Sequence, residues 1–145
     1  MTLRAGRLLG VLVLLVLPVL PRTGAAQGVD QVVAGFVRAW SSEDTGALQT
    51  ILGASVHLEV DGQDYLGVPP RQAAASVDRL FRRFDPRAPS VVRQGDLGED
   101  DGRGFAELSW SPTPPGSAEP VDYLIFLGLR RSPDGWRITE LRILP

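Results

Sequence analysis

The second half of the chain consists of strand-like segments separated by turn residues, and this pattern restricts the fold more than any other feature. The strand-like segments cover residues 90–97, 104–111, 121–131 and 136–144. A charged turn (99–102), a proline-rich loop (112–120) and a tight turn (132–135) separate them. Connections of this kind join antiparallel neighbours, so the pattern predicts a four-stranded meander.

Two of these strands depart from simple alternation. In segment 121–131, Leu124 and Phe126 lie opposite the main apolar face, which predicts a central strand covered on both sides. In segment 136–144 the apolar residues form two pairs of opposite parity, Trp136 with Ile138 and Leu141 with Ile143. A β-bulge near Thr139-Glu140 would bring both pairs to one face and bend the sheet. The alternative is a strand partly buried on both faces.

Three helices and a further strand are predicted before the meander. Apolar residues recur at helical spacing in segments 29–40, 44–52 and 70–85. Asp44 or Thr45 can cap the second helix and Gly53 is expected to stop it. The third helix follows Pro69-Pro70 and is expected to end at Asp85, before Pro86. The alternating segment 56–60 predicts a half-buried strand, and residues 65–67 a short extended piece.

The N-terminal segment has the three-part layout of a secretory signal peptide. Arg4 and Arg7 precede an apolar run from residue 8 to 20, and Gly24-Ala25-Ala26 supplies small residues for cleavage. A retained membrane anchor is the alternative, but the run is shorter than the roughly 20 residues of a spanning helix. We therefore expect a cleaved signal over 1–26 and an exported domain over 27–145, periplasmic or extracellular, with no stable membrane anchor after cleavage.

Composition limits the chemistry of the remainder. Cysteine is absent, which removes disulfides, thiolate nucleophiles and a lipoprotein anchor, and all 15 basic residues are Arg, as in GC-rich bacterial genomes. Three of those Arg and no acidic residue lie in 1–26, so the net charge falls from −2 to −5 on cleavage. This charge argues against nucleic-acid binding. Without a nucleotide or phosphate-loop motif, no cofactor is expected.

The order of elements resembles the nuclear-transport-factor-two-like fold, also called the cystatin-like α+β cone. The segments that carry the resemblance are 29–40, 48–58, 65–67 and 136–138. Residues 56–65, Gln72-Ala73, Leu80-Phe81 and Leu141-Arg142-Ile143 are also similar to small exported bacterial domains without an assigned function. The resemblance implies an α+β fold in which three helices pack on a curved, mostly antiparallel sheet. For an enzyme, the resemblance implies an activity similar to that of ketosteroid isomerases, polyketide cyclases or scytalone dehydratases. Other members of the fold use the cone or the sheet for binding.

The acid–base candidates are few. His57, the single histidine, shares a strand face with Glu59, so the two can pair for proton transfer or simply face solvent. Asp122 shares parity with Leu124; it lies either in an apolar environment, which would raise its pKa, or in water beside the proline-rich loop. Tyr65 is the third weak catalytic candidate. One His without Cys argues against a metal site, and the acidic turn 99–101 lacks the ligand spacing of a calcium loop.

Binding candidates are more numerous. Five aromatic residues with a polar N–H or O–H suit the wall of a half-hydrated pocket: Trp40, Tyr65, Trp110, Tyr123 and Trp136. The cluster Arg79, Arg82, Arg83 and Arg87 either binds an anion or forms a solvated helix face.

The leading hypothesis is an exported, non-catalytic domain that binds a small ligand, peptide or protein partner through its cone or sheet. The alternative is a cofactor-free isomerase, dehydratase or cyclase that uses an acid–base residue in the cone. A homodimer through the exposed sheet is a third possibility.

Overall fold

The computed structural model describes residues 28–98 and 100–145, which form three helices and six strands. The predicted signal peptide, residues 1–26, lies outside the described residues. In chain order the elements are α1 (Val29–Ser41), α2 (Thr45–Ile51), β1 (Leu52–Val60), β2 (Gln63–Val68), α3 (Pro70–Phe81), β3 (Ser90–Asp96), β4 (Arg103–Trp110), β5 (Tyr123–Ser132) and β6 (Gly135–Leu144).

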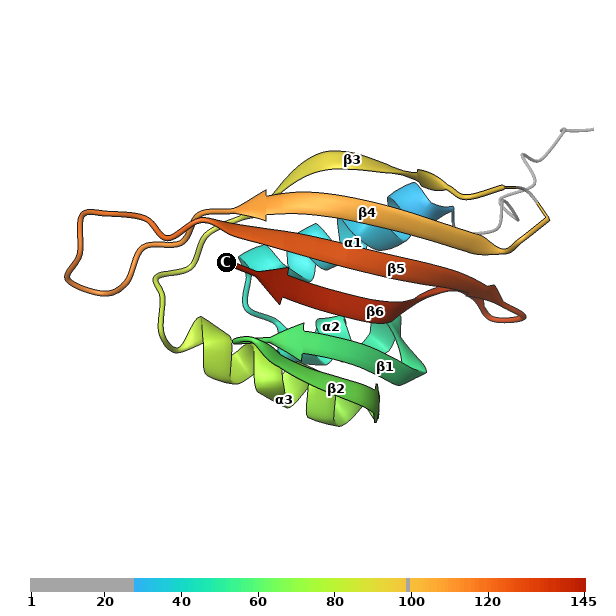
Figure 1. The fold of residues 1–145 in the computed structure, drawn as a ribbon, viewed down its shortest axis with the longest axis horizontal. Helices are drawn as coiled ribbons and strands as arrows, with labels where there is room; N and C mark the ends of the chain where they lie inside the picture. The colour runs from blue at the N-terminus through green and yellow to red at the C-terminus, as the bar shows by residue number, and fades with distance from the viewer. Residues whose placement is uncertain (1–27, 99) are drawn as a thin grey trace, which may run out of the picture.

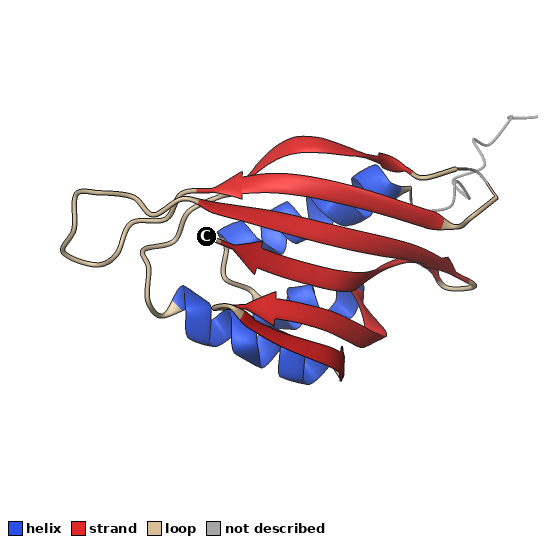
Figure 2. Cartoon of the chain, in the orientation of Figure 1, coloured by secondary structure: helices blue, strands red, loops and turns tan. Residues whose placement is uncertain are grey.

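The six strands form one mixed sheet in the order β2-β1-β6-β5-β4-β3. Strands β3 to β6 pair antiparallel with their sequence neighbours, so the predicted meander is confirmed. Strand β1 joins the sheet parallel to β6, and β2 pairs antiparallel with β1. The three described helices lie on one face of the sheet, and none of them lies on the opposite face (Figures 1 and 2). The α+β class predicted from the sequence is therefore correct.

The predicted bulge in β6 is also present. Leu129 pairs with Ile138 and Gly128 pairs with Glu140, so Thr139 has no partner across the β5–β6 ladder. This extra residue restores the parity of the strand. All four apolar residues consequently face the helices and are buried: Trp136, Ile138, Leu141 and Ile143.

The prediction that β5 is covered on both faces is wrong. Ile125, Leu127 and Leu129 are buried beneath the helices, but Leu124 is 40 % exposed on the other side. Phe126, on the same side, is half-buried. Strand β5 is central within the sheet, yet every helix of residues 28–98 and 100–145 lies on one face, so none of them covers the other face. We call this helix-free side the outer face.

Two helix ends differ from expectation. Asp44 caps α2 as predicted, accepting a hydrogen bond from the Ala47 N–H at 2.9 Å. However, Gly53 is not a helix stop: β1 begins at Leu52, and a Cβ at Gly53 would lie 3.1 Å from Thr139 Cγ2. Helix α3 ends at Phe81, not at Asp85: the Arg83 and Phe84 N–H groups donate to carbonyls three residues back, at 3.1 and 3.0 Å, and the Asp85 N–H donates to the Thr113 carbonyl at 2.9 Å.

The extended piece expected at 65–67 is part of β2. Asp61 and Gly62, both with positive φ (55° and 69°), form the two-residue turn that joins β1 to β2. Such turns match the twist of a hairpin. Strand β2 forms one edge of the sheet, with α3 alongside it (Figure 1).

Candidate functional site

The space between the helices and the sheet is filled by aromatic side chains. Trp40 lies at the centre, with ring centroids 4.9 Å from Phe81 and 5.1 Å from both Phe36 and Trp110. Trp40 is 1 % exposed and Trp110 is 2 % exposed. The expectation that these two indoles line an open pocket is wrong, because such covered rings offer no surface to a ligand. They form the core instead.

The other two predicted wall residues on the sheet also pack against protein. Trp136 is buried, with the Arg131 guanidinium 5.7 Å from its ring centroid. Tyr123 is half-buried, and its ring centroid lies 5.4 Å from that of Trp110 and 5.8 Å from that of Phe84. Of the five aromatic candidates, only Tyr65 is substantially exposed, at 43 %.

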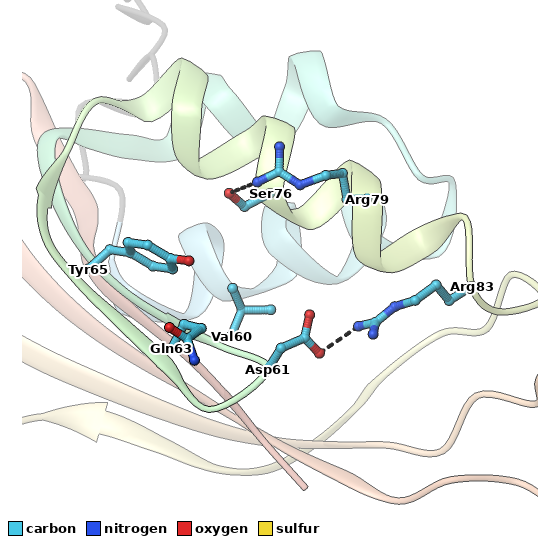
Figure 3. Close-up of a pocket in the computed structure, with 7 residues that line it drawn as sticks. All are labelled: Val60, Asp61, Gln63, Tyr65, Ser76, Arg79 and Arg83. Carbon is cyan, nitrogen blue, oxygen red and sulfur yellow. Dashed lines mark hydrogen bonds and ion pairs between the residues drawn. The ribbon is translucent and has the colours of Figure 1, made fainter.

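Tyr65 lies in a pocket of about 250 Å³ between the β1–β2 hairpin and α3 (Figure 3). We call it the rim pocket. The hairpin contributes Val60, Asp61, Gln63 and Tyr65, and the helical side contributes Ser76, Arg79 and Arg83. Gln63 and Tyr65 are two residues apart in β2, so both side chains project to the same face. Residues 76, 79 and 83 follow helical spacing through α3 and the turn after it.

Arginines dominate the charge of the rim pocket. Arg83 Nη2 donates to Asp61 Oδ1 at 2.6 Å, so this acid is neutralised by its neighbour. Arg79 Nη2 donates to the Ser76 hydroxyl at 2.9 Å (Figure 3). Among the described residues, no carboxylate lies within 4 Å of the Arg79 guanidinium. The pocket therefore has one excess positive charge and unused N–H donors.

The predicted arginine cluster does not act as one surface. Arg82 forms an i,i+4 ion pair with Asp78 at 2.6 Å and lies outside the rim pocket, while Arg87 is exposed beyond α3. Only Arg79 and Arg83 turn toward the hairpin. The spacing of the four arginines could not identify this pair, because it does not show which of them faces the β1–β2 hairpin.

The acid–base candidates lie apart. His57 is on the outer face, where its Nε2 contacts Asp64 Oδ1 and its Nδ1 is 3.7 Å from Glu140. The expected partner Glu59 instead accepts from Arg142 Nε at 2.6 Å. The resulting ion pair raises the pKa of Arg142, chiefly through this hydrogen bond.

Asp122 is exposed just before β5 and accepts a hydrogen bond from the Ser111 hydroxyl at 2.6 Å. It therefore occupies the solvated position beside the proline-rich loop rather than an apolar one. Strands β1 and β6 separate this end of β4 and β5 from Tyr65 on β2. His57, Asp122 and Tyr65 consequently do not converge on one site.

The described residues form neither a metal site nor a membrane-spanning helix. In residues 28–98 and 100–145, no group of three or more His, Asp or Glu is arranged to hold a metal ion. Within the same ranges, none of the helices combines the length and the apolar character needed to cross a bilayer.

Comparison with known proteins identifies the fold. No family model and no curated protein matches the chain. A DUF4783 family protein from Bacteroides ovatus superposes with a TM-score of 0.62 at 20% identity, covering 76% of this chain and 91% of that one. An NTF-2 like protein of unknown function from Shewanella oneidensis gives 0.59 at 15% identity, covering 79% and 94%.

A third similar structure contains a bound small molecule. A hypothetical protein of ketosteroid isomerase-like fold from Catenulispora acidiphila, in complex with trimethylamine, gives a TM-score of 0.62 at 16% identity, covering 79% of this chain and 85% of that one. The chain therefore has the nuclear-transport-factor-two-like fold, which it shares with bacterial proteins of unknown function.

Proposed function

We propose that this protein is an exported domain that binds a small organic anion, such as a carboxylate, in the rim pocket. The observation that carries the proposal is Arg79: its guanidinium lines the pocket without a carboxylate partner among the described residues. A guanidinium presents N–H donors in a planar fork that matches a carboxylate.

The rest of the rim pocket suits such a ligand. Gln63 can donate through its amide, Tyr65 through its hydroxyl, and Val60 provides an apolar wall. Small-molecule sites typically combine an apolar surface with a few placed polar groups. The Catenulispora protein is in complex with trimethylamine, which is a cation at neutral pH. The arginines of the rim pocket here favour a ligand of the opposite charge.

A binding role is favoured over catalysis by the positions of the acid–base candidates. The isomerase, dehydratase or cyclase hypothesis needs a base and a proton donor within reach of one substrate atom. In the rim pocket Tyr65 is accompanied by Asp61, whose carboxylate is held by Arg83, while His57 and Asp122 lie elsewhere. The isomerase, dehydratase or cyclase alternative is therefore not supported by this geometry.

The test is calorimetric titration with acetate, propionate and benzoate, and with trimethylammonium as the cationic control. We expect the carboxylates to bind and the cation not to bind. Arg79→Gln should weaken carboxylate affinity at least about tenfold, since a charge-assisted hydrogen bond contributes about 1.5–3 kcal/mol. Arg82→Gln, which removes an exposed arginine outside the pocket, should leave it unchanged. Equal loss in both variants, or no carboxylate binding, contradicts the proposal.

The outer face supports a second candidate, self-association through the sheet. Leu124 is exposed opposite Leu144, and Phe126 is flanked by two ion pairs, Arg93 with Glu107 and Arg142 with Glu59. An apolar strip between opposite charges is self-complementary in a two-fold dimer. Sedimentation equilibrium should detect a dimer that Phe126→Arg abolishes; a monomer at all protein concentrations removes this candidate.

A further inference from the structure

We infer that the physiological ligand of the rim pocket is the C-terminal carboxylate of an extended peptide that adds to the free edge of β2. The inference rests on the proposed anion site and names the class of molecule that would deliver the anion. Three features of the described residues carry it: the unpaired edge of β2, the position of the arginines along that edge, and the exposed side chains of β2.

Strand β2 is the last strand of the sheet on its side. Its backbone pairs with β1 through Gln63, Asp64, Tyr65 and Val68, and among the described residues the other side of the strand has no partner in the sheet. An unpaired edge is a template for strand addition by another chain. Its regular part is short, because Gly67 has a φ of 69° and the register shifts beyond Leu58. An added peptide can therefore pair with only a few residues.

The rim pocket lies at the beginning of β2, beside Gln63 and the Asp61-Gly62 turn. A peptide that pairs antiparallel to β2 brings its C-terminus to this end, whereas a parallel peptide brings its N-terminus. The Arg79 guanidinium attracts a terminal carboxylate and repels a terminal ammonium. Charge thus selects the antiparallel orientation with a free C-terminus in the pocket.

The exposed side chains of β2 fit an extended peptide. Tyr65 is 43 % exposed on the side of α3, and its neighbour Leu66 is 79 % exposed. Neighbouring residues of a strand project to opposite faces, as do those of an added peptide. One peptide side chain would pack on the Tyr65 ring between β2 and α3, and the next would lie beside Leu66. A lone carboxylate ion would use neither contact.

The experiment compares two bead-bound libraries of random hexapeptides, one with free C-terminal carboxylates and one with C-terminal amides. The fluorescently labelled protein is incubated with each library, and bound beads are counted and sequenced. We expect at least tenfold more binding in the free-acid library, with apolar residues enriched near the C-terminus. Arg79→Gln should reduce free-acid binding to the amide level, whereas Arg82→Gln should not.

A second variant tests edge pairing independently of charge. Leu66→Pro removes a backbone N–H from β2, so this variant should bind the free-acid library less than the parent does, with circular dichroism and thermal unfolding as the check that it is folded. Selected peptides carrying single backbone N-methyl groups should lose affinity at alternate positions, because only alternate N–H groups face β2. An equal number of bound beads in the two libraries, or no bound beads in either library, overturns the inference. If acetate and benzoate still bind through Arg79 in that case, the proposed anion site stands without the peptide.

Discussion

Gly104 determines how closely the start of α1 can approach the sheet. A Cβ added at Gly104 would lie 2.6 Å from Val29 Cγ2 and 3.2 Å from the Gly95 carbonyl oxygen. Both neighbours are poorly able to move, since one is a β-branched side chain and the other is backbone. Gly104 is thus required by close packing and not by a special backbone angle.

We predict that Gly104→Ala lowers the free energy of unfolding by about 2 kcal/mol through overpacking. Gly35→Ala provides the matched control: Gly35 is inside α1, and its nearest neighbours would be at 3.8 and 4.0 Å. The control should raise stability by about 0.5–1 kcal/mol, because alanine is the better helix residue. Urea unfolding followed by tryptophan fluorescence measures both. A Gly104→Ala protein as stable as the parent would show that α1 can shift at no cost.

Single residues also show where sequence reasoning ends. The five aromatic candidates were chosen because each side chain combines an aromatic ring with a polar N–H or O–H. Of these, Trp40 is buried in the core whereas Tyr65 is exposed. An indole or phenol suits either environment, and only the tertiary fold decides between them. The pairing of His57 with Asp64 instead of Glu59 has the same origin, because Asp64 belongs to a strand that the sequence pattern only partly indicates.

At the level of elements, predictions succeeded where local pattern and burial coincide. The parity change in segment 136–144 correctly predicted the bulge at Thr139, since every apolar side chain there had to reach one core. The predicted end of α3 at Asp85 is wrong because Arg83 and Phe84 already donate to carbonyls three residues back, and Asp85 bonds to Thr113, a long-range contact that the local pattern does not show. The rim pocket likewise combines a hairpin and a helix whose relative position no local pattern specifies.

A cross-strand ion pair links β3 to β4. Arg93 donates to both carboxylate oxygens of Glu107 at 2.7 Å. This hydrogen bonding lowers the pKa of Glu107 below its usual 4.5 and raises that of Arg93. A carboxyl group whose pKa is lowered on folding stabilises the protein above its unfolded pKa, and this contribution is lost as the pH falls through the folded value.

We therefore predict that Glu107→Gln is slightly less stable than the parent at pH 7 and that the difference disappears as the pH falls well below 4.5. The effect should be small and should decrease in high salt, because the pair is on the surface. Urea midpoints measured from pH 7 to pH 3 for both proteins provide the test. The matched control is Asp101→Asn, whose nearest contact to Arg103 is 4.0 Å and which should shift little. A difference that grows toward low pH would contradict the prediction.

The whole described fold begins immediately after the proposed signal peptide. Helix α1 starts at Val29, and its buried residues Val32, Val33 and Phe36 belong to the main core. Cleavage after Ala26 would thus leave every described element intact. No Cys is present, so the core holds the fold together without disulfides.

We predict that the exported protein begins at Gln27. Intact mass spectrometry of the periplasmic or culture fraction of an expressing bacterium should give the mass of residues 27–145. Ala26→Arg, which places a large charged residue at the cleavage site, should leave the full-length chain attached to the membrane fraction. Gln27→Asn, next to the same bond, should be processed normally. A full-length parent chain in the membrane fraction would instead show that residues 8–20 act as a retained anchor.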